Sequence, residues 1–293
     1  MVLGVHKKSS RLAVLGELGR FPLLIKGLCN LLKYHAHLNK IKGSNSLIGK
    51  AVTEMSLETG PNLDSWWNRV EKIKDLVGAK YSNYEKIEII GMKIKKCIKS
   101  KFEIFWLDKI KIGNLDKNGT YHNKLKNYST LKGSFTKEPY LDLVPNRAQR
   151  SDLTRLRISA SRLALETGRY SRPPVPPDQR YCRYCRPLEN ENNFLDGYID
   201  DEDHFLNKCT TFQLKRNCFL AKFRSISPNF DSLTDAGRTA TLLCPTSPCA
   251  TKLTNKFIKI LFKFRNDLDN GEPVHHMGYE RGVVLNEFLD DSD

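Results

Sequence analysis

The sequence has no long hydrophobic run and few cysteines, and both absences narrow the class of protein. None of its 293 residues belong to a stretch approaching the roughly 18 uncharged apolar residues that a membrane-spanning helix requires. The first ten residues, MVLGVHKKSS, lack the apolar core of a secretory signal peptide. Eight cysteines are too sparse for a disulfide scaffold. We therefore expect an intracellular protein, nuclear or cytoplasmic, with no membrane partner and with cysteines available as metal ligands.

Acidic residues are also scarce relative to basic ones. The chain has 48 lysines and arginines against 33 aspartates and glutamates, a formal net charge of +15. Residues 186–203 hold one arginine and seven acidic residues, a net −6, so the rest of the chain carries +21. Because phosphates attract such a surplus, the charge favours nucleic acid, RNA or DNA, as a weakly sequence-selective partner.

The spacing of the apolar residues predicts a mainly α-helical fold. They recur every three to four positions within residues 20–38, 64–78, 85–112 and 147–168. The segment 85–112 reads as one long helix in which Gly91 is the position for a kink. Two further basic amphipathic helices are expected beyond residue 209. Four side chains are expected to be largely buried: Leu28, Trp66, Ile90 and Ile98.

The proline run RPPVPP, residues 172–177, is the clearest domain boundary in the sequence, because proline fixes φ and stiffens an extended spacer. A PxxP-binding partner is the less favoured interpretation of this run. The predicted organisation is a helical thumb-like region at 1–112, a loop-rich connector at 113–146, a basic helix and proline-rich spacer at 147–177, a zinc module at 178–225, and C-terminal helices with an acidic tail at 226–293.

Two short cysteine and histidine pairs follow the spacer. Cys182, Cys185, His204 and Cys209 form the pattern C-x2-C-x18-H-x4-C. Zinc prefers four tetrahedral nitrogen and sulfur ligands, and a set of four protein ligands leaves no position for reactive water. The spacing therefore predicts one structural Zn²⁺, the alternative being thiols and a surface histidine without metal. A second metal half-site, less favoured, would use Cys244, Cys249, His275 and His276.

Basic and aromatic residues bracket the first cysteine pair. Guanidinium groups bind phosphate and aromatic rings stack on unpaired bases, so these residues are predicted nucleic-acid contacts. The alternative is that they are solvated side chains on a turn. The bracketing residues are Arg180, Tyr181, Arg183, Tyr184 and Arg186. Lys93 and Lys96, from the 85–112 helix, are added as basic contacts.

Residues 198–201 read YIDD and match the YxDD signature of reverse transcriptases, in which paired aspartates bind catalytic Mg²⁺. That chemistry needs the aspartates on a tight hairpin between hydrophobic strands, with a further aspartate nearby. Here they lie in an acidic stretch between the predicted zinc ligands. We therefore expect an acidic solvated loop, and a divalent-metal nuclease or minimal polymerase built on Asp200, Asp201 and Asp203 is the rival interpretation.

The chain nevertheless resembles the C-terminal part of LINE-type non-LTR retrotransposon reverse transcriptases. Residues 3–23, LGVHKKSSRLAVLGELGRFPL, resemble their helical thumb, and residues 155–185 with DEDHFLNKC at 201–209 resemble their CCHC zinc-knuckle region. The resemblance implies the same four zinc ligands. It also implies a basic and aromatic approach to the knuckle made by Arg155, Arg157, Arg169 and Tyr170.

The resemblance begins at the thumb, and the sequence shows no motif for the endonuclease or the polymerase of a complete family member. We therefore expect no enzymatic activity, and a fragment that grips template RNA or target DNA. Other interpretations are a zinc-stabilised protein-interaction module and a nonfunctional translated remnant.

Overall fold

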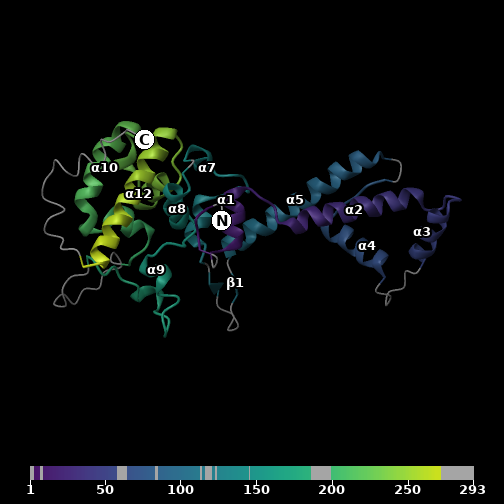
Figure 1. Cartoon of the computed structure of the whole chain (residues 1–293), viewed down its shortest axis with the longest axis horizontal. Coiled ribbons are helices and arrows are strands. Elements are labelled where there is room, and N and C mark those ends of the chain that lie inside the picture. The colour runs from purple at the N-terminus through teal and green to yellow at the C-terminus, as the bar shows by residue number, and fades with distance from the viewer. Residues whose placement is uncertain are drawn as a thin grey trace.

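The computed structural model shows an elongated, mainly helical molecule with two lobes (Figure 1). It describes residues 3–6, 9–57, 65–82, 85–112, 114–115, 121–122, 124–144, 146–185 and 199–271. The long helix α5 (Ile87–Ile112) runs from one lobe into the other. We call the lobe that contains α2, α3, α4 and the first part of α5 the distal lobe, and the rest the main lobe.

The distal lobe is built around α2 (Leu23–Ile41), which packs along α5. Helices α3 (Leu47–Leu57) and α4 (Trp66–Val77) complete it. Its core is apolar and is shared by α2, α4 and α5, as the spacing of the apolar residues in each helix requires. The buried residues are Ile25, Cys29, Leu32, Ala36, Val70, Ala79, Ile90, Ile94 and Ile98.

The helix predicted at 85–112 is confirmed, and it continues through Gly91. This glycine is buried where α5 passes the side chain of Lys33 on α2, so it serves close packing between two helices. Gly78 ends α4 with φ 67°, the left-handed conformation that glycine adopts at low cost. Ser65, whose hydroxyl accepts from the Asn68 amide, is the N-cap of α4.

The burial predictions for this lobe were right for two residues of four. Ile90 and Ile98 are buried, whereas Leu28 is half-buried. Trp66 is 36% exposed, and the buried indole is that of its neighbour, at 5% exposed. Trp66 and Trp67 both lie about one turn from the buried Val70, and it is Trp67 that packs with Leu38 of α2 and Val52 of α3.

The main lobe contains the first helix of the chain and the described part of its second half (Figure 1). The chain enters it with α1, leaves to build the distal lobe, and returns along α5. The indole nitrogen of Trp106 on α5 donates to the carbonyl of Leu12 on α1 at 2.9 Å. Its elements are α1 (Arg11–Leu18), β1 (Asn114–Leu115), β2 (Tyr121–His122), α6 (Lys126–Leu131), α7 (Tyr140–Leu143), α8 (Arg147–Arg157), α9 (Ala164–Thr167), η1 (Pro177–Gln179), η3 (His204–Lys208), η4 (Thr210–Phe212), α10 (Gln213–Ile226), η5 (Phe230–Ser232), α11 (Asp235–Leu243) and α12 (Pro248–Asp269).

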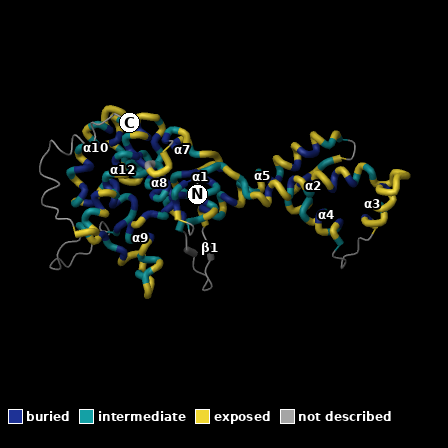
Figure 2. The backbone as a smooth tube through the Cα atoms, viewed as in Figure 1, coloured by how far each residue is buried: buried dark blue, intermediate teal, exposed yellow. Residues whose placement is uncertain are grey.

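One continuous hydrophobic core fills the main lobe (Figure 2). Leu153 precedes the proline-rich spacer and Phe257 follows it, yet both belong to this core. Cys182 and Cys209, two of the predicted metal ligands, belong to it as well. The spacer at 172–177 therefore does not separate two cores, and the segment 178–225 packs as part of a larger lobe.

The prediction of a single helix over 147–168 is wrong. The segment divides into α8 and α9, and between them Ser159 adopts a positive φ of 48°. The start of α9 is fixed from elsewhere in the chain, because the carboxylate of Asp200 accepts from the amide of Ala164 at 2.6 Å. The apolar spacing within 147–168 could not predict this contact, because Asp200 lies outside that segment.

Two basic helices were predicted beyond residue 209, and they correspond to α10 and α12. The sequence analysis missed α11, although the hydroxyl of Thr234 caps its first turn by accepting from the amide of Gly237. Among the described residues, no helix is long and apolar enough to span a membrane.

Candidate metal centre

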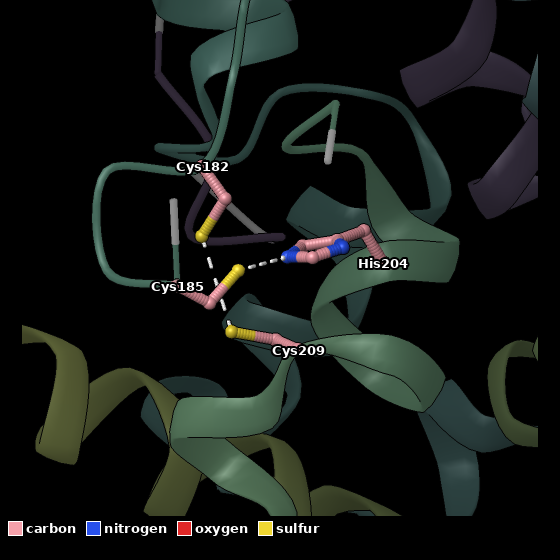
Figure 3. A group of neighbouring side chains, drawn as sticks. All are labelled: Cys182, Cys185, His204 and Cys209. Carbon is pink, nitrogen blue, oxygen red and sulfur yellow. Dashed lines mark hydrogen bonds between the residues drawn. The ribbon is translucent and has the colours of Figure 1, made fainter. Parts of the chain in front are cut away.

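Two segments of the main lobe bring the four predicted ligands together (Figure 3). Cys182 and Cys185 flank a turn that follows the proline-rich spacer and η1. His204 is the first residue of η3, and Cys209 is the residue at which η3 ends. The two segments are joined beside the site by a β-bridge between Tyr181 and Ile199.

The four side chains point toward one another, and their ligand atoms all lie within 4.8 Å of each other (Figure 3). The Sγ atoms of Cys182 and Cys209 are 3.9 Å apart. Sγ of Cys185 is 3.1 Å from Nε2 of His204. Two sulfurs bound at about 2.3 Å to a tetrahedral metal would be separated by a little under about 4 Å. The cluster is therefore close enough to hold one metal ion, as the spacing of the pairs predicted.

Burial and hydrogen bonding set the ionisation of the thiols. The hydrogen bond from the Cys209 thiol, more than any other effect, lowers the pKa of Cys182 to about 3. The pKa of Cys209 is raised, first because it donates to Cys182 and then because it is buried. Burial and the neighbouring Cys182 thiolate raise the pKa of Cys185 to about 11. Without a cation one thiolate suppresses the others, so full ionisation of this cluster requires positive charge at its centre.

Neighbouring side chains hold the two ligand segments in place. The buried guanidinium of Arg216 donates to the carbonyls of Leu206 and Cys209 at 2.8 and 2.9 Å, which fixes the end of η3. Asp201 accepts from the amide of His204 at 2.8 Å at the start of the same element. The hydroxyl of Thr211 donates to the carbonyl of Tyr184 at 3.0 Å and ties the turn to η4.

The YIDD stretch has a structural role instead of the solvated one expected from the sequence. Asp200 is 1% exposed, and Nη1 and Nη2 of Arg265 lie 3.0 and 2.6 Å from its two carboxylate oxygens. Asp203 accepts from the hydroxyl of Thr239 and pairs with Lys208 at 2.7 Å. With Asp201 capping η3, each carboxylate has its own protein partner. Tyr198 lies outside the described residues.

Two of the predicted nucleic-acid contacts are buried, and the structure contradicts that assignment for both. Arg157 is 0% exposed and Arg180 is 7% exposed. The guanidinium of Arg180 donates to the carbonyls of Leu165 and Val175 at 2.6 and 2.9 Å, which fastens the spacer to α9. Neither guanidinium reaches the surface, so neither is available to a phosphate.

Arg157 belongs to a buried ionic network that joins α1 to α8. Its Nε and Nη2 donate to the two carboxylate oxygens of Glu17, both at 3.0 Å. Its Nη2 also lies 2.7 Å from a carboxylate oxygen of Glu138. The Glu17 carboxylate further accepts from the hydroxyl of Tyr140 at 2.7 Å. Helical spacing cannot reveal these partners, because Glu17 lies 140 residues away along the chain.

The remaining predicted contacts reach the surface to different degrees. Tyr170 is 59% exposed, and Lys96 is exposed on α5. Others are engaged within the protein: ion pairs form for Lys93 with Glu85, Arg155 with Asp152, Arg169 with Glu166 and Arg183 with Asp269.

The two tyrosines beside the cysteine pair are also engaged within the protein. Tyr181 is half-buried at the β-bridge. The ring of Tyr184 lies close to the guanidinium groups of Arg183 and Arg265, whose central carbons are 5.1 and 4.7 Å from its centroid. Arg186 lies outside the described residues.

The second metal half-site suggested by the sequence is not assembled in the part of the chain that the structure describes. Sγ of Cys244 accepts from Arg157 at 2.9 Å and faces the main-lobe interior. Cys249 is exposed at the start of α12. The described residues bring neither into a metal-binding group, and His275 and His276 lie outside them.

A row of lysines on α12 is the feature that the predicted contact set missed. Lys252, Lys256, Lys259 and Lys263 follow one another at intervals of four, three and four residues, which places them on one helical face. The sequence analysis recognised a basic amphipathic helix here without assigning a contact to it. The signal was the spacing itself.

No protein-family model, curated protein or solved structure matches this chain. The retrotransposon resemblance stays a prediction, and the case for function depends on the geometry described above.

Proposed function

We propose that this chain is a nucleic-acid-binding protein whose main lobe is organised by one structural Zn²⁺, and that it derives from the C-terminal part of a non-LTR retrotransposon reverse transcriptase. The observation that carries the proposal is the combination of a net charge of +15 with a buried cluster of three cysteines and one histidine. The net charge favours an anionic partner. The metal cluster would stabilise the fold that presents the binding surface to this partner.

The donor set supports zinc as the metal. Three thiolates and one imidazole that can coordinate one tetrahedral metal form a common structural zinc site, whereas calcium and magnesium prefer oxygen ligands. Cys182, His204 and Cys209 are buried, and all four positions are supplied by the protein. Such a site leaves no position for substrate or water, which supports a structural role. The metal would stabilise the fold by bridging two segments of the chain, since Cys185 and His204 are 19 residues apart in the sequence.

Surface charge supports the nucleic-acid partner. Lys93 and Lys96 lie on the exposed side of α5, and the Arg183 side chain, beside the metal cluster, is 66% exposed. The exposed ring of Tyr170 offers a face for stacking on an unpaired base. Arg183 forms an exposed ion pair with Asp269, which contributes little stability and leaves its guanidinium accessible to phosphate, whereas the pairs of Arg155 with Asp152 and of Arg169 with Glu166 are partly buried. These five basic residues and Tyr170 are retained as proposed contacts.

Catalysis at the acidic cluster is not part of the proposal. The carboxylate of Asp200 is buried against Arg265 and caps α9. Asp201 accepts from the amide of His204 at the start of η3, and Asp203 pairs with Lys208. A two-aspartate metal centre would need these groups to converge on one point, and each is committed to a different contact.

The proposal is tested by measuring zinc and nucleic-acid binding in one purified sample. Elemental analysis should give one zinc per chain. Fluorescence anisotropy with a labelled single-stranded RNA should show an affinity that falls linearly on a plot of log affinity against log salt, because bound phosphates release counterions. Replacing Tyr170 with alanine should weaken single-strand binding by about 1 to 3 kcal/mol with little change in that slope. Absence of binding by zinc-loaded protein at near-physiological salt would refute the proposed function, even if zinc is present.

A further inference from the structure

Helix α12 presents two different faces. Its buried face includes Thr254, Phe257, Ile258 and Leu261, and it packs against α8 and α10. The opposite side carries the lysine row, defined as Lys252, Lys256, Lys259 and Lys263. With a rise of about 1.5 Å per residue, these four positions extend over about 16 Å. No acidic residue occurs in α12 before Asp267, so one sign of charge covers this length of helix.

Three lysines of the row are not engaged in ion pairs within the described part of the chain. Lys252, Lys259 and Lys263 form no ion pair with another described residue, whereas Arg183 and Lys208 each pair with a carboxylate. Beside the row, on α8, the half-buried Asp152 lies in the combined field of Arg155, Arg162 and Lys259.

A groove of about 530 Å³ between α10 and α12 adjoins the first half of the row. Lys222 from α10 and Lys252 and Lys256 from α12 line it. The side chains of Ala221, Ile226 and Leu253 add an apolar lining. The groove therefore combines groups that attract phosphate with a surface that suits the flat face of a base.

We propose that the lysine row and the α10/α12 groove bind the phosphate backbone of a single-stranded nucleic acid, with an unpaired base against the apolar lining of the groove. A regular row of one charge matches a polymer whose own charges repeat regularly. In a duplex the base faces are already stacked on one another, so only a single strand can place a base in the groove. This inference rests on the proposed function and names the surface that carries it out.

The test compares two variants that lose the same charge. In the first, Lys252, Lys259 and Lys263 are all replaced by glutamine. In the second, Lys50, Lys72 and Lys80, three exposed lysines of the distal lobe, are replaced in the same way. Binding of fluorescein-labelled single-stranded RNA of about 20 nucleotides is measured by anisotropy over a series of salt concentrations. If each lysine of the row meets one phosphate, the slope of log affinity against log salt should become shallower by about 2, since each contact contributes about 0.7 for a single strand.

The distal-lobe variant should keep the wild-type slope and an affinity within about twofold of wild type. Equal losses in both variants would mean that net charge alone attracts the RNA, and would overturn the inference. So would a wild-type slope in the row variant. If the wild-type protein binds no nucleic acid, the proposed function fails first, so the two failures are distinguishable.

A second substitution tests the groove itself. Ser225 is exposed and lines it, so Ser225→Glu introduces a carboxylate beside the lysines, and Ser225→Gln supplies a neutral control of the same size. We expect the glutamate variant to bind single-stranded RNA at least fivefold more weakly than the glutamine variant. Equal affinity of these two variants would overturn the groove as the binding site.

Two competitors identify the class of partner. A duplex of the same sequence should compete less well than the single strand, and polyglutamate of equal charge should compete poorly. If the duplex competes equally, the assignment of a single strand is wrong. If polyglutamate competes as well as RNA and loses this ability in the row variant, the surface is a site for acidic proteins, and the nucleic-acid assignment is overturned.

Discussion

Replacing Arg157 with methionine distinguishes two possible roles of this residue. The resemblance implies that it contacts nucleic acid, whereas the structure places it in a buried ion pair. The side chain is 0% exposed and makes a two-pronged contact with Glu17, with both N···O distances at 3.0 Å. It also lies 2.7 Å from Glu138 and donates to the carbonyl of Leu243 at 2.6 Å. Methionine fills a similar volume without any of these contacts.

The size of the effect follows from what Arg157→Met leaves behind. Glu17 is itself 0% exposed, and after the substitution it keeps the hydroxyl of Tyr140 as a donor. Removing one partner of a buried ion pair costs about 3 to 5 kcal/mol, because the other charge stays buried without compensation. Arg155→Met on the same helix is the control. Its half-buried pair with Asp152 and its bond to the carbonyl of Gly4 should contribute less to the free energy of unfolding, on the order of 1 kcal/mol.

Urea unfolding can be followed in the main lobe alone. With Trp66 and Trp67 replaced by phenylalanine, the fluorescence of Trp106 reports the main-lobe core, in which it is fully buried. Adding Glu17→Gln to Arg157→Met should restore part of the lost stability, because the double variant leaves no uncompensated carboxylate from this pair. If Arg157→Met costs less than about 1 kcal/mol and instead weakens RNA binding, the residue acts at the surface and the reasoning is refuted.

Three further predictions concern other parts of the molecule. Cys185→Ser should abolish stoichiometric zinc and destabilise the main lobe while the distal lobe keeps its helices; retention of one zinc per chain, measured by elemental analysis, would contradict the ligand assignment. Asp200→Asn should lower the free energy of unfolding by about 3 kcal/mol, because it leaves the buried Arg265 without its carboxylate; unchanged urea unfolding would show that the pair is dispensable. Burial lowers the pKa of His35, so the neutral form is favoured by folding, and this stability is present above the unfolded pKa near about 6.5 and is lost as pH falls below it. Thermal melts monitored by the adjacent Trp67 should therefore show a less stable distal lobe at pH of about 5.5 than at about 7.5, and a His35→Gln variant with the same dependence would exclude this histidine as its source.

The metal cluster was the part of the site that the sequence predicted well. Its ligands come in two short pairs, and each pair is confined by a turn or by one short element, so spacing alone brings the four groups near one another. The identity of the metal is a separate matter, which the donor set supports as zinc. The long helix α5 was predictable for a related reason, since the apolar period of 87–112 is local.

The errors arose where a residue's environment depends on distant parts of the chain. Arginine is ordinarily a surface residue, and only the fold reveals that Glu17 meets Arg157 in the interior. The break between α8 and α9 depends on the Asp200 carboxylate, which is 36 residues from the amide that it caps. Trp66 and Trp67 are adjacent and equally apolar, so pattern alone could not select the buried one. The proline content of 172–177 describes the stiffness of the spacer and says nothing of the core on either side, and residues from both sides pack in one core.

The path of the chain through the two lobes has a consequence for how the protein folds. The main lobe cannot close until α1 meets α8, and the Glu17–Arg157 contact spans 140 residues. Helices α2 and α5 pair within the interval between them, so the distal lobe can form first and bring the ends of that interval together. This shortens the effective loop and lowers its entropic cost of closure. We therefore expect pulsed hydrogen exchange during refolding to protect the amides of α2 and the first half of α5 before those of α8, so that the distal lobe acts as a folding nucleus for the main lobe.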